Sequence, residues 1–276
     1  MNRFLTFALS LLAAFGATSC LDVVSVDIPE GKPLLAVEGA ITDQPAPCVV
    51  KLTKTVPYFN GEPAPAVRGA TVVLTDDQGQ RETLREQSPG EYVSTGVVQG
   101  RIGGRYTLRI EAEGEQYEAE TEIRRTPVID SLGVEFKEAS TGIDEGYYVL
   151  YYGPETPGVG DYYRFRVYRN GRLLNQPQDL IVSSDELVDG NYIGAVELNN
   201  DPFSQNDRIR VELNSIPRDY FFFLNEVATQ INNVGLFASP PANVRTNIRN
   251  RNPSSDKQAV GYFAGFTVRT DSVVIR

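Results

Sequence analysis

The stretch RYTLRIEAEGEQYEAETEI at residues 105–123 alternates between apolar or aromatic and polar residues. In its first half Tyr106, Leu108 and Ile110 share one face of a strand, and the intervening polar residues share the other. Gly114 turns the chain, and the second half alternates in the same way. Successive side chains of a strand point to opposite faces, so one charged face predicts an antiparallel hairpin with one side in water.

Short runs rich in β-branched residues precede this hairpin. LLAVEGAI (34–41), CVVKLTKT (48–55) and GATVVLT (69–75) favour strands, and DDQG at 76–79 favours a turn. Several short strands at this spacing predict a mainly β protein that begins with an Ig-like (prealbumin-like) β-sandwich over residues 34–126.

A second antiparallel β-rich domain is expected over residues 127–276. Pro127 interrupts the strand pattern and marks the junction. Tyrosine-rich runs predict strands, and Asn170-Gly171 predicts a two-residue hairpin turn. Because the chain ends on another strand pattern, we expect its C-terminus to be built into a sheet.

One helix is predicted in this domain, at about residues 216–233. Ser215 is the expected N-cap, Pro217 suits the first turn, and Gly235 follows the end. We expect the helix to pack on two sides, because aromatic residues also lie off its apolar stripe; a membrane- or partner-binding face is the alternative. The stripe consists of Tyr220, Phe223, Leu224, Val227 and Ile231.

The first twenty residues, MNRFLTFALSLLAAFGATSC, have the order of an export signal. Arg3 precedes an apolar run that is too short to span a bilayer, and small residues then lead to Cys20. This order resembles a bacterial lipobox, which predicts a lipoprotein signal peptide at 1–19, lipidation of Cys20 and a tether at 20–33. An ordinary signal peptide with a chance cysteine is the alternative.

The composition excludes several kinds of site. The 276 residues include no histidine, which removes the commonest general base and metal ligand, and the formal net charge of -10 disfavours nucleic acid. If Cys20 carries lipid, Cys48 is the remaining cysteine, so neither a disulfide within the chain nor a cysteine zinc site is expected. No cofactor, no metal and no catalytic residue is predicted.

Two groups of acidic residues have spacings that invite comparison with cation sites. Glu118, Glu120 and Glu122 alternate along one strand face, which predicts a solvated surface, since a cation needs convergent oxygens. The segment from Asp189 begins like a calcium loop but has Ile193 where an oxygen ligand is required.

Tyrosine pairs form the candidate recognition surface. Adjacent residues of a strand face opposite ways, so some rings point outward unless both faces are covered. Exposed rings suit sugar, peptide or protein contacts; the alternative is that tyrosine fills core positions in a chain without tryptophan. The residues concerned are Tyr147, Tyr148, Tyr151, Tyr152, Tyr162 and Tyr163.

Phrases such as VRGATVVLTDDQG (67–79), GRYTLRIEAEGEQYEAE (104–120) and SPPANVRTNIRN (239–250) resemble the family called domain of unknown function 4249, lipoproteins of Bacteroidota. Residues 69–123 also resemble the carboxypeptidase-regulatory-like domain. Asp130-Ser131-Leu132 and Asp271-Ser272-Val273 resemble a short O-glycosylation signal, which makes Ser131 and Ser272 candidate glycan sites that must be exposed.

The family resemblance implies a lipid-anchored accessory of a TonB-dependent receptor at the outer membrane, on its periplasmic or cell-surface side. Our expectation is therefore a protein that binds a small molecule, glycan or peptide and is not an enzyme. One alternative is a lipid-anchored hydrolase of surface glycan or peptide, which needs two facing carboxylates and a raised pKa on one of them. A purely structural surface protein is the other.

Overall fold

The computed structural model describes residues 32–57, 63–233 and 242–276. The chain divides into two units, Met1–Lys32 and Pro33–Arg276, and all elements below belong to the second. The predicted signal peptide, Cys20 and nearly all of the tether lie outside the described residues. No helix in the described part is long and apolar enough to cross a bilayer.

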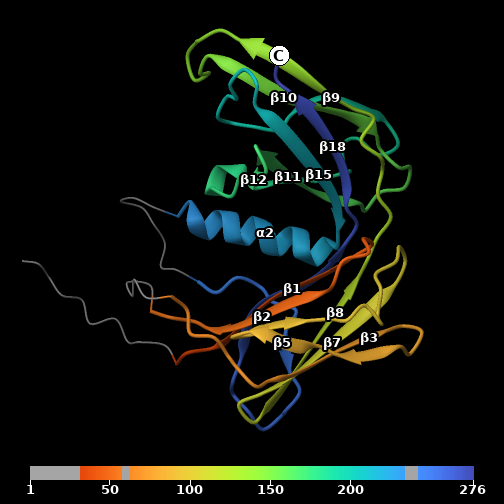
Figure 1. Cartoon of the computed structure of the whole chain (residues 1–276), viewed down its shortest axis with the longest axis vertical. Coiled ribbons are helices and arrows are strands. Elements are labelled where there is room, and N and C mark those ends of the chain that lie inside the picture. The colour runs from red at the N-terminus through yellow and green to blue at the C-terminus, as the bar shows by residue number, and fades with distance from the viewer. Residues whose placement is uncertain (1–31, 58–62, 234–241) are drawn as a thin grey trace, which may run out of the picture. The chain divides into compact units, whose positions relative to one another are not determined.

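Two five-stranded sheets pack face to face as a β-sandwich, shown in the lower part of Figure 1. The first core lies between them and includes Leu52, Leu74, Leu108 and Phe263, all fully buried. One sheet has the order β17 (Ala259–Phe266), β1 (Leu35–Thr42), β2 (Val49–Lys54), β6 (Glu91–Val93), β5 (Arg85–Ser88). The other has the order β16 (Arg249–Asn250), β8 (Glu115–Glu122), β7 (Arg105–Ala112), β3 (Thr71–Asp76), β4 (Arg81–Thr83).

The hairpin predicted from residues 105–123 is confirmed. Strands β7 and β8 pair antiparallel, with Leu108 opposite Ala119. Both of these side chains are buried, while Arg109 and Glu118 on the outer face form an ion pair at 2.8 Å. The mainly β, sandwich-forming fold class is likewise confirmed.

A second pair of antiparallel sheets encloses the second core, which includes Val149, Val211 and Leu213. One sheet has the order β14 (Tyr192–Glu197), β10 (Gly146–Pro154), β9 (Ser131–Lys137). The other has the order β12 (Arg172–Leu173), β11 (Tyr162–Arg169), β15 (Arg208–Ile216), β18 (Arg269–Val274), with β13 (Ile181–Ser184) also paired to β11 and a short 3-10 helix η2 (Pro177–Asp179) before it.

Two local predictions for this region are confirmed. Asn170 and Gly171 have positive φ angles and form the turn between β11 and β12. The C-terminal strand β18 pairs antiparallel with β15, so the end of the chain is built into a sheet.

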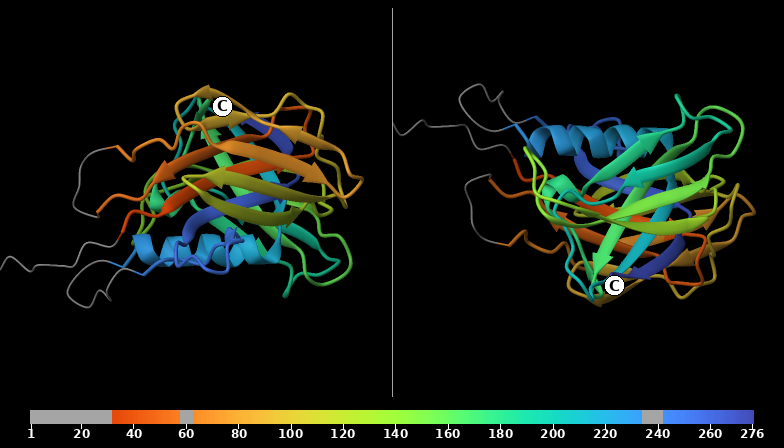
Figure 2. Two further views of the ribbon diagram at one scale, coloured as in Figure 1. Left: turned by 90° about the horizontal axis from the view of Figure 1, so that it is seen from below. Right: turned by 90° about the horizontal axis from the view of Figure 1, so that it is seen from above.

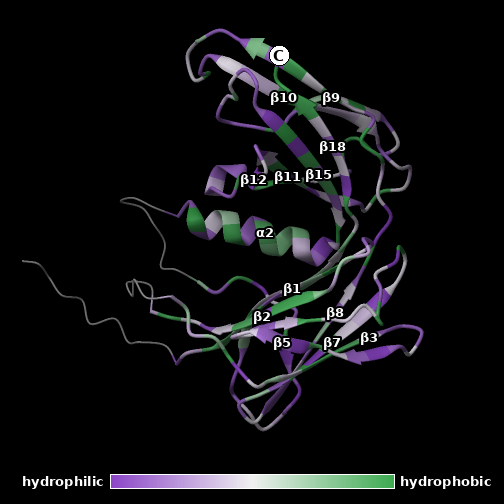
Figure 3. Cartoon of the chain, viewed as in Figure 1, coloured by the Kyte–Doolittle hydropathy of each residue, from purple (hydrophilic) through white to green (hydrophobic). Residues whose placement is uncertain are grey.

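Helix α2 (Arg218–Ile231) lies against both sets of sheets. Its Leu224 packs in a helix core with Tyr162 and Ile216 from one side and Phe266 from the other, which confirms the expected two-sided packing. In both views of Figure 2 the helix runs alongside the strands, and Figure 3 shows hydrophobic residues recurring along it.

The helix predicted at about residues 216–233 is confirmed, but its predicted N-cap was wrong. Strand β15 continues to Ile216, so the expected cap Ser215 lies in the strand and is fully buried, and Pro217 is the N-cap. A buried strand end followed by proline leaves the first helical residue at Arg218.

Strand β17 departs from the division expected after residue 126. It pairs parallel with β1, from Leu35 opposite Ala259 to Thr42 opposite Phe266. Because its side chains alternate, Phe263 enters the first core while Tyr262 and Phe266 enter the helix core. A strand buried on both faces loses the polar alternation that marks a surface strand, which is why the sequence pattern did not reveal its partner.

Phe263 should therefore contribute strongly to stability. We expect Phe263→Ala to lower the free energy of unfolding by about 3–5 kcal/mol, the cost of removing a fully buried ring. Phe136→Ala on β9, where the ring is 52% exposed, should cost about 1 kcal/mol or less. Urea unfolding followed by circular dichroism measures both; equal losses would contradict the two-faced role of β17.

Candidate functional site

The six tyrosines do not form an exposed recognition surface. Tyr148, Tyr151, Tyr162 and Tyr163 are between 2% and 5% exposed, and the remaining two are half-buried. The rings at 151 and 163 lie in the second core, and the ring at 162 lies in the helix core. Both faces of β11 are covered, so neither residue of its tyrosine pair faces outward, and the sequence prediction of a surface is corrected.

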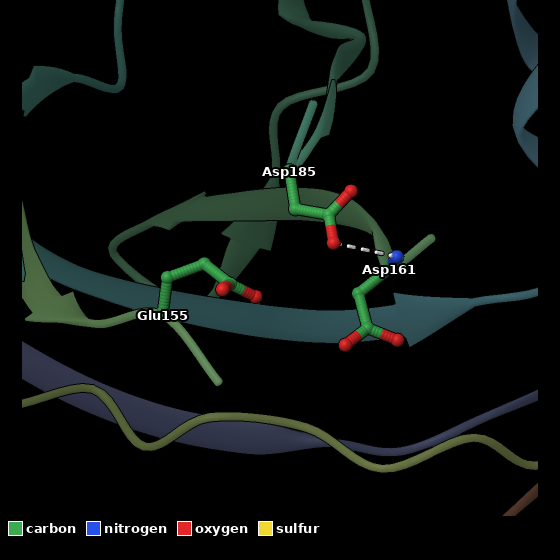
Figure 4. Close-up of side chains that lie close together, drawn as sticks. All are labelled: Glu155, Asp161 and Asp185. Carbon is green, nitrogen blue, oxygen red and sulfur yellow. Dashed lines mark hydrogen bonds between the residues drawn. The ribbon is translucent and has the colours of Figure 1, made fainter. Parts of the chain in front are cut away.

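Three buried carboxylates meet at the end of the second pair of sheets (Figure 4). Glu155 and Asp161 flank the segment that joins β10 to β11, and Asp185 directly follows β13. They are 4%, 1% and 0% exposed, respectively, and one carboxylate oxygen from each lies within 4.8 Å of the others. A buried charge is costly unless it is hydrogen-bonded or paired, so the partners of each carboxylate decide what the cluster can do.

Asp185 is held by backbone N–H groups. Its carboxylate accepts hydrogen bonds from Gly160 N at 2.8 Å and from Asp161 N at 3.0 Å. A second backbone hydrogen bond runs in the opposite direction: Asp185 N donates to the carbonyl oxygen of Asp161 at 3.1 Å. Asp185 therefore fastens the start of the 185–191 segment to the loop before β11.

Asp161 carries the ion pairs of the cluster. Arg125 lies 2.9 Å from one carboxylate oxygen, and Arg124 lies 3.4 Å from the other while also pairing with Glu122. Arg125 also donates to the carbonyl oxygen of Gly158 at 2.8 Å. Arg124 and Arg125, which directly precede the expected junction at Pro127, thus attach the chain after β8 to the loop before β11.

Glu155 accepts one hydrogen bond on each carboxylate oxygen. The hydroxyl of Tyr163 donates at 2.7 Å and Gly190 N donates at 2.7 Å. Glu155 N in turn donates to the carbonyl oxygen of Asn191 at 2.8 Å. Burial, followed by the contact with this carboxylate, raises the pKa of Tyr163, so the phenol remains a donor.

These contacts assign a structural role to the cluster. Each carboxylate already accepts N–H or O–H donors, and Arg124 and Arg125 supply positive charge at Asp161, where a metal ion shared by all three carboxylates would have to bind. Hard cations need several converging oxygens free of such donors. The segment from Asp189 that begins like a calcium loop is also used structurally, because Asp189 accepts from Gly158 N at 2.6 Å.

An apolar cavity of about 480 Å³ opens beside this cluster. It lies between β13 and β14, two strands that end their respective sheets and do not pair with each other. The 185–191 segment joins these strands and is fastened by the buried carboxylates. The lining includes Tyr151, Phe165, Ile181, Ile193, Val196 and Leu213.

A larger groove of about 810 Å³ lies on the first sandwich and is polar. Glu118, Glu120 and Glu122 line it together with arginines and the first residues of α2. Glu118 pairs with Arg109, and Glu122 pairs with Arg124. The glutamates are thus partly neutralised at the surface, as a solvated strand face requires.

The remaining candidate residues are not part of the cavity lining. Ser131 on β9 and Ser272 on β18 are both exposed, which meets the requirement for glycan sites, and their modification stays a prediction. Cys48 is a free thiol, 3% exposed, in the first core.

Sequence reasoning missed the cavity and the carboxylates beside it. Glu155 and Asp161 are six residues apart, but Asp185 lies 24 residues further along the chain, and the three belong to no contiguous motif. The available signal was the glycine content of their neighbourhoods, Gly158, Gly160 and Gly190, because exposed N–H groups of such loops often bind a carboxylate.

Comparisons with known proteins give a family and distant structural likenesses. The family described as "Domain of unknown function (DUF4249)" matches residues 22–272. A segment of two fibronectin type III domains from chicken tenascin is similar at 13% identity, covering 68% of this chain and 92% of that chain, with a TM-score of 0.20. No curated protein sequence matches the chain. The sandwich description therefore depends on the strand pairing given above.

The carboxylate cluster can be tested by one isosteric change. Asp185→Asn should lower the free energy of unfolding by about 2–3 kcal/mol, because an amide nitrogen replaces an oxygen that faces two N–H donors. Glu186→Gln, one residue away and exposed, should change it by about 0.5 kcal/mol or less. Urea unfolding compares the two variants. A stable Asp185→Asn protein would show that the cluster does not fasten the loop.

Alkaline pH should weaken folding through two buried groups. Burial raises the pKa of Cys48 from 9.0 to about 12 and that of Tyr151 from 10.0 to about 12. The folded state holds these protons more tightly, so the stabilisation is complete below pH 9 and is lost as the pH rises towards 12. Urea midpoints across this range measure the fall, and Cys48→Ala should make it smaller. A midpoint independent of pH would contradict the burial of both groups.

Proposed function

The chain belongs to the family of domain of unknown function 4249. From this membership we propose that the protein is an outer-membrane lipoprotein that binds a ligand without catalysing a reaction. It acts as an accessory of a TonB-dependent receptor, on the periplasmic or cell-surface side. The association with such a receptor is what the family resemblance implies, and the anchor is what the sequence up to Cys20 implies.

The apolar cavity beside the buried carboxylates carries the proposal. Its volume lies within the range of small-molecule sites, and its lining is largely aliphatic and aromatic. The three carboxylates that come together next to it are all occupied by structural hydrogen bonds and ion pairs. This arrangement supports binding better than acid–base chemistry.

The hydrolase alternative receives less support. It requires a carboxyl group whose pKa is raised so that it can act as a general acid. The backbone N–H groups of Gly90 and Gly69 lower the pKa of Glu86, and the side chain of Asn250 lowers that of Glu115. Hydrogen bonds and a salt bridge from Arg245 lower the pKa of Glu226. These groups are therefore poor general acids.

The tether fits an anchored binding protein. Residues 20–33 separate Cys20 from the compact unit that starts at Pro33. Fully extended, a tether of this length reaches at most about 45 Å. Several acyl chains on Cys20 would hold the protein firmly, since each buried CH₂ adds about 0.8 kcal/mol.

Cell fractionation with two matched cysteine variants tests the anchor. We expect the wild-type chain in the membrane fraction, with an intact mass that includes acyl chains on Cys20. Cys20→Ala should appear in the soluble fraction, while Cys48→Ala should stay with the membrane, because its thiol is buried in the core. Release of the wild-type chain by buffer alone would end the lipoprotein proposal.

Mild detergent extraction followed by affinity capture of the wild-type chain tests the partner. An outer-membrane receptor should be recovered with it, and Cys20→Ala should recover less because it is no longer held beside the receptor. Recovery of no outer-membrane barrel with the wild-type chain would contradict the accessory role.

A further inference from the structure

Charge is distributed unevenly around the cavity between β13 and β14. Two of the residues that line it are acidic, Glu155 and Glu186, and none of the described lining residues is basic. Glu186 is exposed, whereas Glu155 is 4% exposed and lies at the polar end, next to Tyr163. The apolar space therefore has one buried acidic group at its wall.

The neighbouring arginines leave that group without a cationic partner. Arg125 pairs with Asp161, and Arg124 divides its contacts between Asp161 and Glu122. The negative charge of the three carboxylates thus formally exceeds the positive charge of the two arginines beside them. Glu155 is the member of the cluster that lines the cavity, so the uncompensated charge lies at the cavity wall.

Hydrogen-bonding capacity also remains at this end. A carboxylate offers about four lone-pair positions, and Glu155 uses two of them for Tyr163 and Gly190.

The mouth of the cavity presents apolar surface to water. Leu187, which belongs to the lining, is 96% exposed, and it lies in the segment that the buried carboxylates fasten. Leu187 thus extends the apolar lining outward, where a ligand in the cavity could contact it.

We propose that this cavity binds a small amphipathic amine, with its apolar body between β13 and β14 and its ammonium group against the carboxylate of Glu155. The inference deepens the proposed function by naming the ligand class. An ammonium group supplies the missing positive charge and donates to the free lone pairs of Glu155, while an apolar body replaces water along Phe165, Ile193 and Val196.

Three probes that share a phenylbutyl body test the proposal: phenylbutylamine, phenylbutanol and phenylpentanoate. Calorimetric titration of the detergent-solubilised full chain should give the tightest binding for the amine and the weakest for the carboxylate. We expect the amine to bind at least about tenfold more tightly than the alcohol, as a charge-assisted contact would provide. Equal affinities of the wild-type chain for the three probes, or no binding of any probe, would overturn the proposal.

Variants then locate the contact. Glu155→Gln should bring the amine to the affinity of the alcohol, and its amide oxygen still accepts one of the two existing donors. Glu186→Gln, the other acidic lining residue, should leave the amine preference unchanged because its charge is exposed to solvent. Val196→Phe should weaken binding of all three probes by filling the cavity. A preference that persists in Glu155→Gln would overturn the assignment.

The outcome is independent of the anchor and the receptor. Failure of all probes to bind would remove the amine site and leave the lipoprotein and its partner to fractionation and affinity capture. Loss of membrane attachment or of the receptor would leave the probe titrations unaffected.

Discussion

The parallel pairing of β17 with β1 is the contact on which the arrangement of the described residues depends. Phe263 completes the first core from one face of β17, while Tyr262 and Phe266 on the other face complete the helix core. Gly261 permits the close approach, since its φ is +91° and a Cβ atom there would lie 2.0 Å from the carbonyl oxygen of Val37. One strand thus supports two separate cores.

Polar contacts extend the same connection into the second pair of sheets. Asp43, after β1, accepts from Val268 N at 2.9 Å and pairs with Arg269 at 2.6 Å, where β17 leads into β18. In the other sheet of the first sandwich, Arg124 and Arg125 follow the end of β8 and reach Asp161. Buried or partly buried ion pairs with defined partners fix geometry more than they add stability. The pairs at Asp161 hold the loop between β10 and β11, which contributes Glu155 to the cavity wall.

Local patterns in the sequence predicted the local structure well. The hairpin at 105–123 has one wet face, so its period of two is unbroken, and Asn170-Gly171 needs only its own positive φ angles. Tertiary contacts were not predictable in the same way. The tyrosines of β11 are covered on both faces by cores that come from distant segments, and Asp185 meets Glu155 and Asp161 only after two loops converge. Such convergence has no signature in a single sequence.

The pairing of β1, the first described strand, with β17, the second last, affects the rate of folding. One edge of β1 stays unpaired until residues 259–266 have been synthesised and have reached it. The first sandwich is therefore among the last parts of the structure to be completed. Contacts between such distant segments form slowly, because closing a very long loop costs conformational entropy before the contacts can compensate for it. During synthesis the edge of β1 therefore has no partner strand, and an unpaired edge can associate with other chains. This favours keeping the nascent chain unfolded until it is complete.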